Sequence, residues 1–283
     1  MGWKIWQQGE KKQWSFPTAL KEPFHLLTIT LLSLLLPLSF LLLARLTTAR
    51  YLFAFKANPT SLPPSLIFSF FLYTNPTLLH VLVSLVCVAA LLQGLTGQVK
   101  LSSESPEPVL RPRLYTAWIF LCTLQVCVGL GIEGSIDAGV DGFGFGYERN
   151  LLSRVIFFLG LHETMLYWSR TIVKPVVDDS VYGFATEERW VERVAMATSF
   201  GSLWWWGLRD EVESLVVVAE TKKELLTGVD VADFVGWWLY YLTVTVGMVR
   251  VVKGLIWFGV ILLCKTRRIE GNADDYRGNE EKV

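Results

Sequence analysis

The sequence predicts an all-α fold: a polytopic membrane helix bundle of about six transmembrane helices, within a range of five to seven. Apolar residues make up 52% of the chain, and they are clustered, since residues 24–44 contain no Asp, Glu, Lys or Arg. A helix needs roughly 20 such residues to cross the hydrocarbon core of a bilayer. Tryptophans gather near the ends of the apolar runs, where the headgroup region favours amphipathic rings. The runs do not alternate with polar residues, so helices and not barrel strands are expected.

The predicted spans follow one another along the whole chain. In order, they are 24–45, 77–95, 114–132, 151–168, 190–208 and 234–264. Residues 66–73 are apolar but too few to cross, and we expect an interfacial or re-entrant segment there. Residues 209–233 place apolar side chains at helical spacing, which predicts an amphipathic helix on the membrane or on neighbouring helices. The last span is either one long helix or a shorter span followed by an interfacial helix.

Three regions are expected: an N-terminal cytoplasmic tail (1–23), a transmembrane helical domain (24–266) and a disordered cytoplasmic tail (267–283). With the N-terminus inside, the inner segments carry 15 Lys and Arg residues and the outer segments carry 7. Positive loop charge favours the cytoplasmic side, so both termini are predicted to be cytoplasmic. We expect an integral protein of an endomembrane, such as the endoplasmic reticulum, or of the plasma membrane.

Composition limits the partners and cofactors. The net charge is zero, which does not indicate nucleic acid as a partner. None of the four cysteines lies in a CxxC pair, so redox and metal chemistry at cysteine are not indicated. No cofactor is expected. The expected partner is the lipid bilayer. The sequence does not decide whether the protein also binds a polar solute or forms a homo- or hetero-oligomer.

The main candidate site is an intramembrane polar cluster of His162, Glu163 and Arg250. Glu163 falls within roughly 5 Å of the middle of the fourth span. A charge there costs at least ~2.5–3.5 kcal/mol, so a partner is expected. Arg250 supplies it if 234–264 is one helix, whereas it snorkels to the surface if the span ends near residue 249. The cluster then either handles a polar solute or proton, or joins helices structurally.

Acidic residues outside this cluster suggest two weaker candidate metal sites. Asp137, Asp141 and Glu148 match three positions of a calcium-binding loop, but Gly139 occupies a fourth ligand position. A solvated glycine-rich loop is the alternative. Asp178 and Asp179 lack the rest of a metal–phosphate motif, and we expect them in a turn or a helix cap.

Two segments carry a family resemblance. The stretches "LLPLSFLLLARL" and "HETMLYWSRTIVKPVVDD" resemble plant multi-span membrane proteins. The resemblance implies a plant endomembrane or plasma-membrane protein and implies no chemistry.

The expected function is non-enzymatic, either a solute-handling carrier or a membrane scaffold organised around Glu163. The alternative is a membrane-embedded enzyme that acts on a lipid-like substrate through His162 and Glu163, with Asp178 and Asp179 on the cytoplasmic side. The absence of a P-loop and of a nucleophile motif in the sequence disfavours this alternative.

Overall fold

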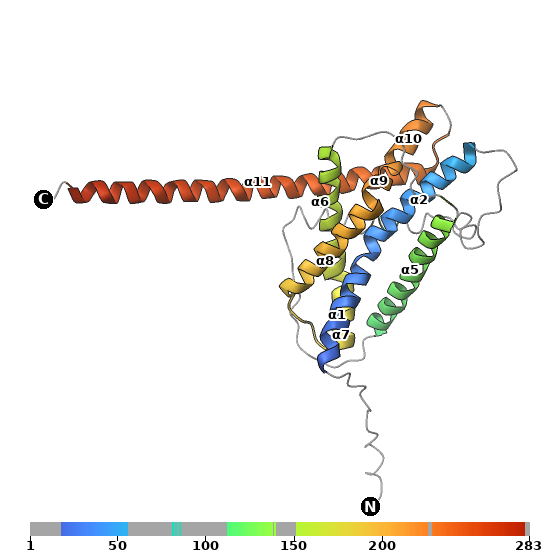
Figure 1. Ribbon diagram of the computed structural model, residues 1–283, viewed down its shortest axis with the longest axis horizontal. Helices are drawn as coiled ribbons and strands as arrows, with labels where there is room; N and C mark the ends of the chain where they lie inside the picture. The colour runs from blue at the N-terminus through green and yellow to red at the C-terminus, as the bar shows by residue number, and fades with distance from the viewer. Residues whose placement is uncertain are drawn as a thin grey trace, which may run out of the picture.

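The computed structural model describes residues 18–55, 81, 83, 85, 112–137, 139, 151–225 and 228–280. Within these ranges every regular element is helical, as the sequence predicts (Figure 1). The elements are α1 (Thr18–Ser33), α2 (Leu35–Phe55), α5 (Pro112–Asp137), α6 (Leu151–Trp168), the π-helix η1 (Ser169–Val173), α7 (Lys174–Val181), α8 (Trp190–Leu203), the π-helix η2 (Trp204–Leu208), α9 (Arg209–Glu211), α10 (Ser214–Glu224) and α11 (Val231–Glu280).

The helices form one bundle from which α11 projects (Figure 1). α5 packs against α2, and α1 packs against α7 and α8. α6 makes its most extensive contact with α11, which crosses it and continues beyond the other helices toward the C-terminus. α11 therefore has two parts, an N-terminal part inside the bundle and a C-terminal part outside it.

α1 and α2 are two halves of one long helix that is interrupted at Leu34. Pro37 has no amide hydrogen, and its ring conflicts with the carbonyl four residues earlier, on Ser33, where α1 ends. Hydrogen bonds still cross the break, from the Leu34 amide to the Thr30 oxygen at 3.0 Å and from Leu38 to Leu34 at 2.9 Å. The helix continues to Phe55. The helix thus extends ten residues beyond residue 45, where the predicted first span ends, and Arg45 is buried within it.

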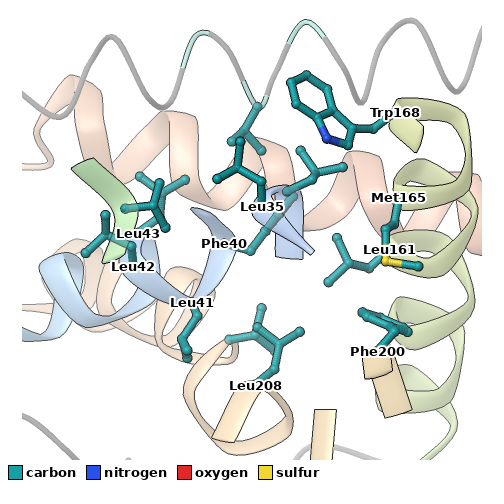
Figure 2. Close-up of a cluster of buried hydrophobic side chains, with 14 of the residues drawn as sticks. Leu35, Phe40, Leu41, Leu42, Leu43, Leu161, Met165, Trp168, Phe200 and Leu208 are labelled. Atoms are coloured by element: carbon teal, nitrogen blue, oxygen red, sulfur yellow. The ribbon is translucent and has the colours of Figure 1, made fainter. Parts of the chain in front are cut away.

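The core lies where α2, α6 and α8 meet (Figure 2). Phe157 of α6 stacks on Tyr240 of α11 with ring centroids 4.8 Å apart, and it meets Phe40 of α2 edge-on at 6.1 Å. The Trp168 indole donates to the Leu32 carbonyl at 3.0 Å, which joins α6 to α1. Each fully buried side chain of this size contributes about 1.5–3 kcal/mol to folding.

Three described segments are long and apolar enough to cross a membrane. They are Leu20–Leu52, Thr116–Ile136 and Val231–Lys265. The predicted spans at 151–168 and 190–208 are helical but are not among these three segments, and in the second of them α8 ends after 14 residues and the π-helix η2 follows. The predicted span at 77–95 and the segment at 66–73 lie outside the described residues, except for positions 81, 83 and 85. A count of six spans thus stays a prediction.

The structures of α10 and α11 decide between alternatives that the sequence left open. α11 is one continuous helix from Val231 to Glu280, so 234–264 is not interrupted. It also extends through most of the range 267–283, for which a disordered tail was expected. α10 is no membrane-surface helix, because residues 214–219 are all buried and the helix packs on α2 and α11. Its predicted association with neighbouring helices is the alternative that the structure supports.

Candidate functional site

The α6–α11 crossing is built on two glycines. A Cβ on Gly160 would collide with the Thr243 carbonyl, and a Cβ on Gly247 would collide with the Ile156 carbonyl. Only glycine permits this backbone approach, which is typical of helix pairs inside membranes. Thr164 and Thr243 lie one turn away, so Gly160-x-x-x-Thr164 faces Thr243-x-x-x-Gly247. This pair of small-residue motifs was present in the sequence and was overlooked.

The crossing brings together two of the three predicted site residues. Glu163 of α6 and Arg250 of α11, three residues beyond the paired glycines, form an ion pair between Oε2 and Nη1. Their side chains remain 38% and 37% exposed. Because α11 is continuous from Val231 to Glu280, Arg250 lies within the helix and not at its end. The pair therefore lies on an accessible flank of the crossing.

His162 does not join this pair. Its ring lies beside Phe158 and Phe200, with ring centroids 6.3 Å and 5.6 Å apart. Consecutive helical residues point about 100° apart, which directs His162 toward α8 and Glu163 toward α11. An acid–base pair of His162 and Glu163 is therefore not assembled.

The predicted calcium loop falls largely outside the described residues. Asp137 is the last residue of α5, whereas Asp141 and Glu148 are not described. Among the side chains that are described, no group of three or more His, Cys, Asp or Glu residues could hold a metal ion. The side chain of Asp137 is not described either, so the metal prediction is not tested at any of its three positions.

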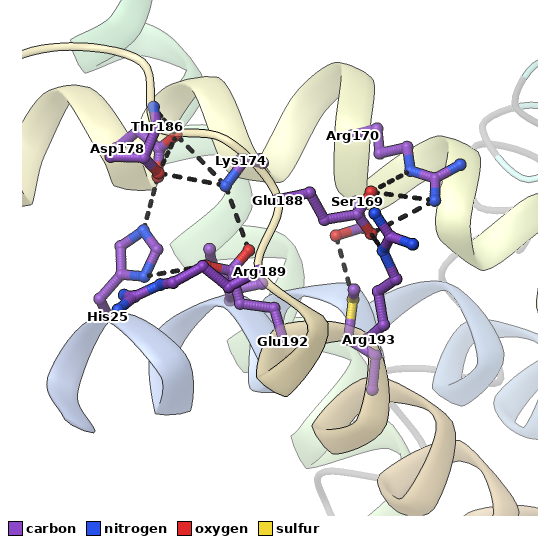
Figure 3. A network of polar contacts seen from close by, with 12 residues as sticks. His25, Ser169, Arg170, Lys174, Asp178, Thr186, Glu188, Arg189, Glu192 and Arg193 are labelled. Carbon is purple, nitrogen blue, oxygen red and sulfur yellow. Dashed lines mark hydrogen bonds and ion pairs between the residues drawn. The ribbon is translucent and has the colours of Figure 1, made fainter. Parts of the chain in front are cut away.

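A second polar cluster, the His25 cluster, lies at the end of the bundle formed by α1, α7 and α8 (Figure 3). It consists of His25, Lys174, Asp178, Thr186 and Glu192. His25 Nε2 lies 2.5 Å from Asp178 Oδ1, and Lys174 Nζ lies 3.1 Å from Glu192 Oε2. The side chains of His25, Asp178 and Glu192 are at most 2% exposed. Sequence reasoning expected Asp178 in a turn or a cap and did not expect this burial.

The chain reversal after α7 completes the surroundings of Asp178. Gly183 adopts a φ of +77°, a left-handed conformation that ends the helix and that glycine favours. The chain then returns, and the amide and hydroxyl of Thr186 donate to Asp178 Oδ2 at 2.9 Å and 3.0 Å. Burial opposes ionisation of Asp178, but hydrogen bonds from His25 and Thr186 and the charge of Lys174 outweigh it, so the pKa of Asp178 is lowered.

A third polar cluster, the Arg45 cluster, lies at the middle of α2, 20 residues along α1 and α2 from His25. It consists of Arg45, Ser135 and Glu211. Arg45 donates from Nε and Nη2 to the two Glu211 oxygens at 2.6 Å and 3.0 Å, and from Nη1 to Ser135 at 3.0 Å. Nearby, Arg154 of α6 makes a similar bidentate contact with Glu213 at 2.7 Å and 3.1 Å. These pairs fix α2, α5 and α6 to the segment around α9.

The His25 and Arg45 clusters are separated by about the thickness of a bilayer core. His25 and Arg45 are 20 residues apart on α1–α2, which corresponds to about 30 Å at 1.5 Å per residue. Glu192 and Glu211 are 19 residues apart through α8 and η2, or about 28 Å. The hydrocarbon core of a bilayer is also ~30 Å thick. Two separate helices thus give the same spacing between the polar clusters.

The surface between these clusters is apolar. Exposed side chains there include Leu27, Leu31, Ile119, Val126 and Val194. The exposed hydroxyls of Thr123 and Thr198 donate to carbonyls four residues earlier in their own helices. Such hydroxyls need no water, as hydrocarbon requires. This apolar belt is the surface expected of a protein in contact with lipid tails.

No family model matches the chain, and no curated protein or solved structure is similar to it. The resemblance to plant membrane proteins finds no support in these comparisons. The three clusters and the apolar belt are therefore the basis for a functional proposal.

Proposed function

We propose that this chain is an integral membrane protein whose bundle crosses the bilayer between the His25 cluster and the Arg45 cluster. Three apolar segments of sufficient length support a membrane location. The roughly 30 Å spacing of the clusters supports a crossing for α6 and for α8–η2 as well, although neither segment is apolar enough to indicate one by composition. With the predicted span at 77–95, these segments give six crossings.

The same arrangement supports cytoplasmic termini. In the six-crossing topology, α1, α5 and α8 run outward and α6 runs inward. The His25 cluster then lies on the side of the N-terminus, and Arg45, Ser135 and Glu211 lie on the other side. The predicted excess of Lys and Arg favours a cytoplasmic location for the N-terminal side. Endoplasmic reticulum and plasma membrane both remain part of the proposal.

The role that this geometry supports best is that of a non-enzymatic membrane scaffold. The observation that carries it is the Glu163–Arg250 pair, which lies within the apolar layer yet stays more than one-third exposed. A charged pair at this depth needs further polar contacts, because lipid tails offer none. A polar side chain on a transmembrane helix of a neighbouring protein supplies such contacts. We infer that the pair is a lateral contact site for another membrane protein.

Photo-crosslinking at Gly254 tests this role. Gly254 is exposed, lies one helical turn beyond Arg250 on the same face of α11, and has no atom of the described residues within 4 Å of the position of an added Cβ. A photoreactive residue there is expected to form a protein adduct in membranes, and Glu163→Gln is expected to reduce that adduct at least tenfold. The matched control is Leu130 of α5, which is 40% exposed and remote in sequence from the pair. Lipid adducts alone at Gly254, or a protein adduct that persists in Glu163→Gln, would contradict the scaffold role.

A solute-handling role makes a different prediction. If the pair binds a polar solute, Glu163→Gln changes uptake into vesicles while the folded state is unaffected. The enzymatic alternative is less well supported, because His162 packs between phenylalanine rings and not beside Glu163. It predicts that a bound lipid co-purifies with the protein and is altered on incubation.

A further inference from the structure

The Glu163–Arg250 pair leaves hydrogen-bonding groups of its side chains unused. A guanidinium has five N–H donors, and even a bidentate contact with a carboxylate occupies only two of them. No other hydrogen bond or ion pair joins either side chain to the described residues. Arg45, by contrast, donates to Ser135 as well as to both oxygens of Glu211. In an apolar layer, the remaining donors of Arg250 need acceptors from outside the bundle.

The pair lies on a flank of α6 that another helix can approach. Leu159 and Tyr167, one turn before and one turn after Glu163 on the same face, are both half-buried. One turn beyond Arg250, Gly254 is exposed and has no atom of the described residues within 4 Å of the position of an added Cβ. A helix that packs along this flank of α6 therefore reaches both charged groups.

The charges of the pair favour one kind of partner. Glu163 and Arg250 together are neutral, and a partner that brought a single unpaired charge would leave a net charge in hydrocarbon, which is costly. A second copy of the chain brings one carboxylate and one guanidinium. When its Arg250 lies beside the first Glu163 and its Glu163 beside the first Arg250, the four charges alternate in sign and sum to zero. The flank is thus complementary to itself.

Membrane geometry permits this arrangement. Two copies with the same topology are related by a two-fold axis along the membrane normal, and rotation about that axis leaves the depth of every residue unchanged. Residues can therefore meet across the axis only when they lie at similar depths. Glu163 and Arg250 fulfil this condition, because they already contact each other within one chain.

We propose that the partner at Glu163 and Arg250 is a second copy of this chain, related by such a two-fold axis, with α6 of each copy beside α6 of the other. The inference rests on the proposed scaffold role and names its partner. Each guanidinium gains a second carboxylate, so that donors left unused within one chain find acceptors in the other.

Photo-crosslinking between two tagged copies distinguishes this inference from the scaffold role itself. The full chain is co-expressed with two different tags, and one copy carries a photoreactive residue in place of Gly254. An adduct that contains both tags is expected in membranes. An adduct with a different protein would overturn self-association and leave the scaffold role standing, whereas lipid adducts alone would contradict both.

Charge reversal tests the contact between copies. Two tagged copies of Glu163→Arg, or two of Arg250→Glu, bring four like charges together, and recovery of the second tag is expected to fall at least tenfold. A mixture of the two variants again sums to zero, and at least tenfold more of the second tag is expected than with either variant alone. A mixture that associates no better than each variant with itself would overturn the inference.

Two double variants keep the test decisive if a single variant does not fold. Glu163→Arg/Arg250→Glu reverses the pair without removing it and is expected to associate as the unmodified chain does. Glu163→Met/Arg250→Met removes the charges and is expected to lose association at least tenfold. Lys253→Gln is the matched control, since Lys253 is an exposed cation directed about 60° away from Arg250 around α11. Equal association of the unmodified chain and the methionine variant would contradict pairing through these charges.

Discussion

The first and last hydrophobic helices have similar composition and opposite surroundings. The most apolar window of Leu20–Leu52 is 61% buried by protein, whereas that of Val231–Lys265 is 11% buried. α2 is enclosed by α5, α6 and α10. The outer part of α11 has exposed side chains all around it, among them Leu255, Ile256, Trp257 and Phe258. Hydropathy shows that both helices avoid water, but it does not show whether protein or lipid covers them.

The difference also explains where charges are tolerated. Arg45 in α2 is almost completely buried and makes a bidentate contact with Glu211, with the Trp206 ring 5.6 Å away. Arg250 in α11 has an accessible ion pair with Glu163. A charge within the protein must have its hydrogen bonds satisfied there, while a charge on an accessible flank can also interact with a partner molecule.

The largest effect is expected when the buried charge of α2 loses its partner. Arg45→Met leaves Glu211 without its cation, and breaking a buried pair lowers the free energy of unfolding by about 3–5 kcal/mol. Equilibrium unfolding in detergent micelles measures the loss. The double variant Arg45→Met/Glu211→Gln is expected to recover part of it, because no unpaired charge remains. A single variant as stable as the unmodified protein would contradict the burial of Arg45.

Truncation of one phenylalanine in each helix compares their surroundings directly. Phe40 of α2 is fully buried, and Phe40→Ala is expected to lower the free energy of unfolding by about 3–5 kcal/mol. Phe258 of α11 is 56% exposed, and Phe258→Ala is expected to change the free energy of unfolding by less than about 0.5 kcal/mol. The same unfolding assay serves for both. Equal effects would mean that a partner covers α11 as completely as the bundle covers α2.

Glycine substitutions are expected to have smaller effects than the Arg45 and Phe40 substitutions, and effects of opposite sign at the α6–α11 crossing and in the outer part of α11. Gly160→Ala forces the backbones of α6 and α11 apart and is expected to destabilise the protein by about 1–3 kcal/mol. At Gly259 of α11, no atom of the described residues lies within 4 Å of the position that an alanine methyl group would occupy. Gly259→Ala is therefore expected to stabilise its helix by up to about 1 kcal/mol. Thermal unfolding in the same detergent measures the stability of both glycine variants. A neutral Gly160→Ala would argue against the close crossing.

Much of the fold could be predicted from the sequence because long apolar runs allow few structures in a bilayer. The helical class and a hydrophobic first helix follow from run length and charge position, whereas the sequence left open the continuity of α11 that brings Arg250 to Glu163. The burial of Arg45 within a longer helix did not follow from the sequence, in which Arg45 was interpreted only as the charge that ends the first apolar run. Its partner Glu211 lies 166 residues away, and no local pattern indicates that pairing.

The His25 cluster was missed for a related reason. His25 is close to the predicted start of the first span, and Asp178 was assigned to a turn on its local sequence. Their contact joins residues 153 apart and depends on the reversal at Gly183. The small-residue motifs around Gly160 and Gly247 are different, because both are visible in the sequence and are typical of close helix contacts in membranes.

The central claim is that the apolar belt between the His25 and Arg45 clusters lies in hydrocarbon. Spin labels in lipid vesicles test it directly, at Leu31 of α1, Val126 of α5 and Ile256 of α11, which are 46%, 59% and 63% exposed. Phe184, which is 60% exposed just beyond α7, is the reference for the aqueous side. We predict that oxygen relaxes the first three labels far more than a water-soluble nickel chelate does, and that the order is reversed at Phe184. Relaxation of the Val126 label by the nickel chelate as strongly as at Phe184 would contradict the account.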